Sequence, residues 1–209
     1  MRLGHDLLAA LARLAASLRV GCPAPGVAGA PGGCRTTGLE PGFAGQRICS
    51  GEKGGPATGP NPTDRGKAGT KRHLVTDRRG TPLGIVLTGA NRHDSTVLAA
   101  TLDAIPPVRS GRRGRPRRRP RKLHADKGYD FRRCRDECRK RGITPRIARR
   151  GVDTSQRLGR HRWVIERTHA WLARLRRLTV RYERREDIHL AFTTLGCALV
   201  CLNQIKRFC

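Results

Sequence analysis

The sequence predicts an α/β fold in which helices flank a mixed β-sheet, and three observations support this prediction. Residues 70–90 contain two runs rich in β-branched and apolar residues on either side of a Gly/Pro turn, which is typical of an antiparallel hairpin. Short apolar runs at 122–126 and 143–148 predict two further strands. The last part of the chain has helical periodicity over 161–178 and again over 187–205. Strands that alternate with helices in this way indicate a sheet covered by helices.

Two shorter helices are expected between the strands. Residues 96–105 have the apolar spacing of a helix, and Asp94 or Ser95 is placed to cap it. A second helix is expected over 131–141, with Asp130 as its cap. The expected order is therefore hairpin, helix, strand, helix, strand and long helices.

The composition of the chain changes near residue 53, where we place a domain boundary. Residues 3–20 have the pattern of a short amphipathic helix, whereas residues 21–52 are rich in Gly, Pro, Ala and Cys without a regular period. Such a stretch buries too little apolar surface to offset the entropy of ordering it. We therefore expect residues 1–52 to be poorly ordered, or translated out of frame, with one short helix, and residues 53–209 to form the folded domain.

The charge of the chain points to a nucleic acid as its partner. Lys and Arg number 44 against 16 Asp and Glu, which gives a formal net charge of +28 at pH 7. Each phosphate that a basic side chain neutralises releases condensed counterions, which favours binding to a polyanion. A ribosomal-type RNA binder, or a GC-rich gene that favours Arg codons, would give a similar composition.

Neither a secretory leader nor a membrane span is expected. The Leu- and Ala-rich start contains charged residues, and no apolar run approaches about 18 residues. Eight cysteines without a leader are expected to be reduced thiols, which favours the cytoplasm. The pairs Cys134/Cys138 and Cys197/Cys201 favour core packing over a zinc site, because structural zinc uses tighter spacings on turns.

An arginine-rich run between residues 109 and 122 is the main candidate for contacts with phosphates, and a solvated linker is an equal alternative. Basic residues before and within the predicted hairpin are further candidates. The expected DNA-binding residues are Arg112, Arg113, Arg115, Arg117, Arg118, Arg119, Lys67, Lys71 and Arg72.

Two carboxylates stand where they could share a metal ion. Asp126 ends a predicted strand, at the edge where α/β proteins tend to bind ligands. Glu166 lies in the middle of a predicted helix, with Arg162 one turn before it. Hard divalent cations prefer oxygen ligands, and a metal pair activates both the attacking and the leaving oxygen in phosphodiester chemistry. The alternative is that both carboxylates only balance nearby arginines on a solvated surface.

Several motifs in a fixed order resemble the DDE transposases of bacterial insertion sequences, in the branch called insertion sequence family five. They are T-G-P-N-P-T-D-R-G-K, A-N-R-H-D-S, H-A-D-K-G-Y-D, R-G-I-T-P-R-I-A-R-R-G and H-R-W-V-I-E-R-T-H-A-W-L. The resemblance covers roughly residues 53–207. It implies an RNase H-like fold and a bacterial protein that acts on the nucleoid.

The resemblance also implies a catalytic site. In the family, two Asp and one Glu hold Mg²⁺ (or Mn²⁺); by position, Asp126 is the second Asp, Glu166 is the Glu, and Arg162 matches a signature arginine near that Glu. The implied substrate is double-stranded DNA, both transposon terminal repeats and target DNA, cleaved and joined by a homodimer on paired ends. Two signature positions differ here, since Gly159 stands at the family's tyrosine and Ala173 at its later basic residue.

The first Asp of the family has no counterpart here. The resemblance places it at about residues 43–46, but no Asp occurs between Asp6 and Asp64. We therefore expect the first strand to be missing or degraded and this copy to be inactive, with Asp64 and Asp77 as weak candidates for a substitute. A basic nucleic-acid-binding protein without catalysis is the alternative function.

Overall fold

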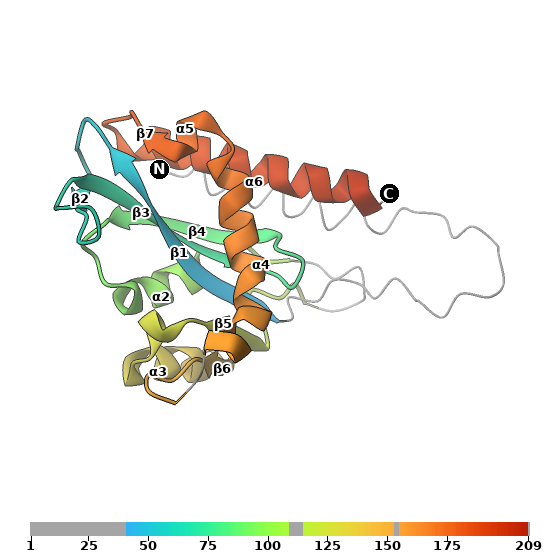
Figure 1. The fold of residues 1–209 in the computed structure, drawn as a ribbon. Coiled ribbons are helices and arrows are strands. Elements are labelled where there is room, and N and C mark those ends of the chain that lie inside the picture. Colours follow the sequence, from blue (N-terminus) through green and yellow to red (C-terminus); the bar gives the residue numbers. More distant parts are fainter. Residues whose placement is uncertain (1–40, 109–114, 153–154, 209) are drawn as a thin grey trace.

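The computed structural model describes residues 41–108, 115–152 and 155–208, and the side chains of residues 155–161, 207 and 208 are left out of the description. These residues form a mixed sheet with helices packed on both of its faces (Figure 1). The helix expected over residues 3–20 lies outside the described residues. Among the described residues, the mixed sheet and its flanking helices form the RNase H-like arrangement that the resemblance implied.

The sheet has seven strands, and its centre is β1. The strands are β1 (Gly42–Gly51), β2 (Gly59–Pro60), β3 (Ala68–Thr76), β4 (Pro82–Gly89), β5 (Lys122–Ala125), β6 (Thr144–Ile147) and β7 (Val180–Arg181). Strand β1 pairs antiparallel with β3, which pairs antiparallel with β4. On its other side β1 pairs parallel with β5, and β5 pairs parallel with β6. The change from antiparallel to parallel pairing therefore occurs at β1.

Five α-helices are described. They are α2 (Asp94–Asp103), α3 (Arg132–Lys140), α4 (Ser155–Ala173), α5 (Arg176–Thr179) and α6 (Glu186–Phe208), and a 3-10 turn covers Lys127–Tyr129. Within the described residues the other expected helices and strands are confirmed within a few residues at their ends, but the helix expected over 161–178 is observed as two, α4 and the short α5. The caps differ: His93 caps α2 by accepting from the Ser95 amide, and Asp130 instead accepts from Arg135 and from the Arg150 amide.

Strand β1 lies on the N-terminal side of the expected domain boundary at residues 52 and 53. It pairs with β3 over eight residue positions and contributes Phe43, Ala44 and Cys49 to the buried interior. The first strand is therefore present, contrary to the expectation that it was missing or degraded. The sequence analysis underrated it because Gly42, Gly45 and Gly51 dilute its apolar pattern, whereas pairing on both edges holds the strand in place.

Two hydrophobic clusters lie on opposite faces of the sheet. The first joins α2 and α3 to β5 and β6 and includes Cys134 and Cys138. The second lies under α4 and α6 and includes Cys197. Cys201 is buried as well, so these four cysteines take part in core packing, as the sequence analysis favoured.

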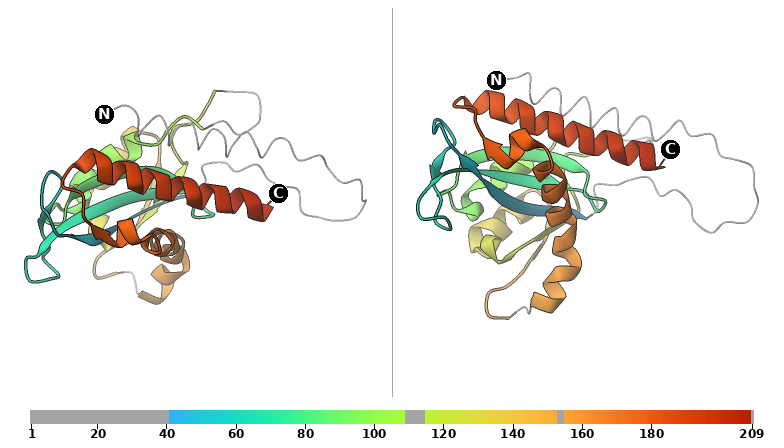
Figure 2. Two further views of the ribbon diagram at one scale, coloured as in Figure 1. Left: turned by 90° about the horizontal axis from the view of Figure 1, so that it is seen from above. Right: turned by 45° about the horizontal axis from the view of Figure 1, so that its top comes forward.

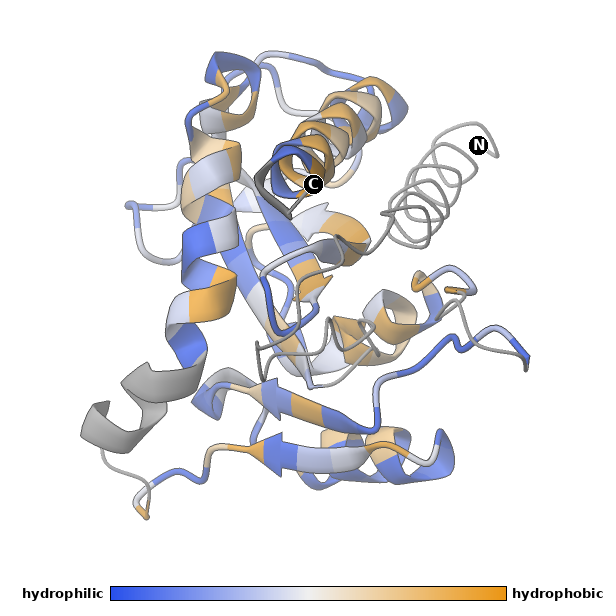
Figure 3. Cartoon of the chain, turned by 90° about the vertical axis from the view of Figure 1, so that its right-hand side faces the viewer, coloured by the Kyte–Doolittle hydropathy of each residue, from blue (hydrophilic) through white to orange (hydrophobic). Residues whose placement is uncertain are grey.

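Helix α6 runs along the sheet on the same face as α4 (Figure 2). By length and composition, Glu186–Lys206 could cross a membrane, which the sequence analysis did not expect, and Figure 3 shows its hydrophobic colouring. Half of the apolar window is buried inside the protein, where α6 packs on β4 and α4. The core helix of a soluble protein passes the same test, so its composition agrees with this packing.

The turn between β3 and β4 attaches the hairpin to α4. Gly80 has a φ of +78°, and the Oδ1 atom of Asp77 accepts from the amides of Arg79 and Thr81 at 2.8 Å each. The hydroxyl of Thr168 on α4 donates to the Gly80 carbonyl at 2.8 Å. Asp77 therefore has a structural role in this turn.

We predict that Gly80→Ala lowers the free energy of unfolding by about 2 kcal/mol or more. The backbone at Gly80 has a left-handed conformation, and the new Cβ would lie 2.7 Å from the Thr168 hydroxyl. Gly66→Ala is the control, since Gly66 has a φ of +73° but no atom within 4 Å of a Cβ; we expect a loss of only about 1 kcal/mol there. Urea denaturation measures both. Equal losses would contradict the role assigned to the Thr168 contact.

Candidate active site

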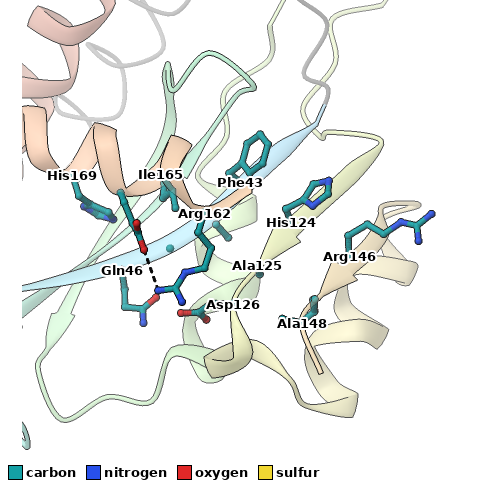
Figure 4. A pocket seen from close by; sticks show the side chains of 14 residues that line it. Phe43, Gln46, His124, Ala125, Asp126, Arg146, Ala148, Arg162, Ile165 and His169 are labelled. Carbon is teal, nitrogen blue, oxygen red and sulfur yellow. Dashed lines mark ion pairs between the residues drawn. The ribbon is translucent and has the colours of Figure 1, made fainter. Parts of the chain in front are cut away.

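A cavity of about 460 Å³ opens between the first half of β1, the C-terminal ends of β5 and β6, and the overlying helix α4 (Figure 4). It receives side chains from all four elements. Its lining residues are Phe43, Ala44, Gly45, Gln46, His124, Ala125, Asp126, Arg146, Ile147, Ala148, Arg162, Ile165, Glu166 and His169. The three residues that the sequence singled out for catalysis, Asp126, Arg162 and Glu166, therefore line one cavity.

Asp126 follows the last residue of β5 and caps the 3-10 turn at Lys127–Tyr129. Its Oδ1 atom accepts from the Gly128 amide at 2.9 Å, which fixes the carboxylate at the strand end. Burial raises the pKa of Asp126 above its usual value. The positive charge of Arg162 and hydrogen bonds from Gly128 and Gln46 act in the opposite direction on that pKa.

Glu166 and Arg162 lie one turn apart on α4 and form an ion pair at 3.2 Å. Their side chains are 61% and 47% exposed, so the pair contributes at most about 1 kcal/mol and opens readily. Figure 4 shows the Arg162 guanidinium close to Asp126. This guanidinium therefore places a positive charge near both carboxylates.

The part of β1 that lines the cavity has one polar side chain. Phe43 stacks on His124 with ring centroids 5.2 Å apart, and Ala44 is buried in the first hydrophobic cluster. A Cβ on Gly45 would lie 2.8 Å from Cγ1 of Ile165, so α4 leaves little space there. Gln46 reaches the cavity and hydrogen-bonds to the Asp126 carboxylate. The sequence analysis missed Gln46 because it assigned the whole segment before residue 53 to a poorly ordered region.

Asp94 is a further carboxylate near the site that the sequence analysis treated only as a helix cap. It begins α2, and its Oδ1 atom accepts from Lys71 at 2.9 Å. A Cβ on Gly128 would lie 3.0 Å from Asp126 Oδ1 and 3.2 Å from Asp94 Oδ2, so both carboxylates border the same glycine. Asp94 raises the pKa of Asp126 through its negative charge. The position of Asp94 in the N-R-H-D-S motif was the one signal in the sequence.

The two weak candidates for a substitute carboxylate lie elsewhere. Asp64 pairs with Lys67 at 3.8 Å in the loop before β3, and Asp77 holds the β3–β4 turn. Neither lines the cavity. The structure therefore does not bring either residue to Asp126 and Glu166.

The nine expected DNA-binding residues fall into four groups. Arg72 is 1% exposed, and Lys71 is 8% exposed and bound to Asp94, so neither presents its charge to a DNA surface, which corrects the expectation for both. Their strand runs through the middle of the sheet, where alternate side chains point inward on either face. Lys67 is exposed in a loop. Arg112 and Arg113 lie outside the described residues.

The remaining four arginines, Arg115, Arg117, Arg118 and Arg119, are exposed and line a shallow concavity before β5. They lie at the opposite end of β5 from Asp126, and four residues of strand span roughly 13 Å. Arg146 on β6 is paired in register with His124 and lines the cavity, between the arginine run and Asp126 along the sheet. Basic side chains therefore occur along the sheet edge that leads to the cavity.

The oxygen donors at the cavity fit a divalent cation. The described residues contain no cluster of three or more His, Cys, Asp and Glu side chains arranged to hold a metal. Asp126 and Glu166 supply two carboxylates, and the buried Oε1 atom of Gln46 has no hydrogen-bond partner. A buried oxygen acceptor beside two carboxylates is the donor set that Mg²⁺ and Mn²⁺ prefer.

The fold is that of a transposase domain. The family described as "Transposase DDE domain" matches residues 42–201, and the chain belongs to this family. A Burkholderia cepacia protein named as a transposase for the insertion sequence element IS402 is 51% identical over 210 residues, which cover 99% of this chain and 98% of the relative. The chain is thus an insertion-sequence transposase, and the alignment also extends through the segment before β1.

The stability of the fold depends on pH through His169, a buried histidine that lines the cavity. His169 is 4% exposed, and burial, with the charge of Arg72, lowers its pKa to about 3. Unfolded His takes up a proton near pH 6.5, so the unfolded state gains protons first as the pH falls and the folded state loses relative stability.

We predict that the free energy of unfolding falls between about pH 6.5 and pH 4, and that His169→Leu reduces the slope by about 1.4 kcal/mol per pH unit. His73, whose pKa burial lowers to about 4, accounts for a further part of the slope in the same direction. Urea denaturation at a series of pH values measures the slope. An unchanged slope in the His169 variant would show that its ring is not held neutral in the folded protein.

Proposed function

We propose that this transposase binds double-stranded DNA and, with Mg²⁺ or Mn²⁺, cleaves and joins strands at the ends of its insertion sequence. The observation that supports this most is the convergence of Asp126, at the end of β5, and Glu166, on α4, at one cavity. A strand-end carboxylate and a helix carboxylate on opposite walls can hold a cation between them. Such an enzyme would work on the nucleoid in the bacterial cytoplasm, as a homodimer on paired ends.

Four of the residues that line the cavity have a proposed part in the reaction. Asp126 and Glu166 would hold the metal ion, which supplies Lewis-acid activation of phosphate oxygens when bound. Arg162 would turn from Glu166 to a phosphate oxygen, because a metal ion takes its place beside the carboxylates. The exposed arginines before β5, with Arg146, would hold the DNA backbone along the sheet edge.

The proposed chemistry consists of two phosphoryl transfers. In cleavage, a water oxygen attacks phosphorus, the bond to the 3′ oxygen breaks, and that oxygen takes up a proton, which leaves a 3′-hydroxyl and a 5′-phosphate. In joining, this 3′-hydroxyl loses its proton, attacks a target phosphorus and displaces a target 3′ oxygen, which is protonated in turn. The protein contributes positions and charges, which is most of what such reactions need.

This copy is proposed to be slow at both steps, because β1 provides no carboxylate to the cavity. A site with fewer anionic ligands holds its cation less firmly and positions the reacting oxygen less well. The alternative function is DNA binding without catalysis. It draws support from the ion pair of Arg162 and Glu166, which neutralises one of the two carboxylates.

We predict that Glu166→Gln abolishes Mn²⁺-dependent nicking of terminal-repeat DNA, a loss of about a hundredfold or more, and leaves DNA affinity within about twofold. Glu52→Gln is the control, because it makes the same change of charge at an exposed position just beyond the far end of β1. Nicking of a labelled supercoiled substrate and a gel-shift assay measure the two properties. If neither the parent nor the Glu52 variant nicks DNA although both bind it, the alternative function is correct.

We predict that Arg118→Ala combined with Arg119→Ala weakens DNA binding and reduces the slope of log affinity against log salt by about 2, roughly 0.9 for each phosphate that is no longer neutralised. Arg184→Ala combined with Arg185→Ala removes the same charge from an exposed loop before α6 and should leave the slope unchanged. Fluorescence anisotropy with a duplex at several salt concentrations measures both. Equal changes in the two variants would assign the effect to net charge alone.

A further inference from the structure

We infer that Gln46 is the third oxygen ligand of the metal site in this chain, with a neutral amide oxygen where its family has a first aspartate. The inference rests on the proposed function, because it assumes that a cation binds between Asp126 and Glu166. It adds a ligand that the sequence did not suggest. The resulting metal site binds its cation weakly, because it has one fewer negative charge than a site with three carboxylates.

The pairing of β1 with β5 limits which residues can reach the site. The parallel register places Ala44 opposite Ala125, so Gly45 and Gln46 are the next residues of β1 beside Asp126. Side chains of a strand alternate between faces, so these two positions cover both faces of the sheet. Ile165 of α4 occupies the space on the Gly45 side. Within β1, Gln46 alone brings a polar group to the Asp126 carboxylate.

The hydrogen bonding of Gln46 indicates a ligand position. Its amide hydrogen-bonds to the carboxylate of Asp126, while its Oε1 atom is buried without a hydrogen-bond partner. A buried acceptor left unpaired costs about 1–3 kcal/mol, and such a cost is explained where the acceptor serves to bind an ion. Rotation of the amide group would direct this oxygen toward a cation that binds Asp126.

The chemistry of the amide oxygen suits this role. Mg²⁺, Mn²⁺ and Ca²⁺ accept Asn and Gln carbonyl oxygens as well as carboxylates, and the number of charged ligands sets the affinity. In Figure 4 the Gln46 amide, Arg162 and Asp126 lie together at one end of the cavity. The Gln46 amide and the Arg162 guanidinium thus stabilise the negative charge of Asp126, as a bound cation would.

The surroundings of Gln46 on the neighbouring strand β3 favour a neutral side chain at this position over a carboxylate. His73 is opposite Gln46 in the antiparallel register, is 1% exposed, and has a pKa that burial lowers to about 4. Asp94 lies nearby with its charge already matched by Lys71. A neutral side chain avoids adding a further carboxylate beside Asp126 and Asp94 in a partly buried position, where like charges repel.

The test measures binding of Mn²⁺ to the full chain. Binding is detected as a decrease in the electron paramagnetic resonance signal of free Mn²⁺. Gln46→Glu keeps the size of the side chain and supplies a carboxylate, so we expect Mn²⁺ to bind about tenfold tighter or more. Gln46→Leu removes the oxygen and should weaken binding several-fold. Asn203→Asp makes the same charge change as Gln46→Glu at an exposed position of α6 and should bind Mn²⁺ like the parent.

Asp126→Asn separates this inference from the function on which it rests. If Asp126→Asn loses Mn²⁺ while both Gln46 variants bind it like the parent, the metal site stands but Gln46 is not a ligand, and the inference is wrong. If Asp126→Asn binds Mn²⁺ like the parent, the proposed metal site is itself wrong, and the inference falls with it. The midpoint of thermal unfolding, measured with and without Mn²⁺, shows that each variant is folded, and Gln46→Glu should gain the most from the metal.

Discussion

The parallel pairing of β1 with β5 is the contact on which the candidate active site depends. It holds the first half of β1 beside Asp126, under α4, which carries Arg162 and Glu166. Strands β1 and β5 are about 80 residues apart in the chain, and β5 is about 40 residues from Arg162 and Glu166 of α4. No hydrogen bond within a helix or hairpin could bring these elements together. The cavity is therefore a product of sheet topology, and loss of this pairing would separate Gln46 of β1 from Asp126 at the end of β5.

Positive charge has two different roles in this molecule. Arginines on the surface before β5 remain exposed, where their charges are available to a polyanion. Arg72 and Lys71 point into the interior, where Lys71 pairs with Asp94 and burial lowers the pKa of Arg72. Arg162 lies between these extremes, beside both carboxylates of the cavity. A count of basic residues therefore overstates the surface available to DNA.

The fold was largely predictable from the sequence because its elements have local signals. The Gly/Pro turn at Gly80, the periodicity of α4 and α6 and the short apolar runs of β5 and β6 all correspond to observed elements. The short elements β2, α5 and β7 were not expected, and the longest missed element was strand β1, since its glycines and Gln46 give no strand pattern. Pairing on both edges and contacts with α4 stabilise it, and a sequence read locally contains neither.

The sequence by itself determined the type of each side chain and the motifs that place the chain among DDE transposases, including Asp126, Arg162 and Glu166. Only the tertiary structure decided which groups meet. It brought Gln46 and Asp94 to the neighbourhood of Asp126, kept Asp64 and Asp77 away, and buried Arg72. The physical reason is that strand register and helix packing set distances between residues far apart in the chain, whereas a local pattern sets only which face a residue occupies.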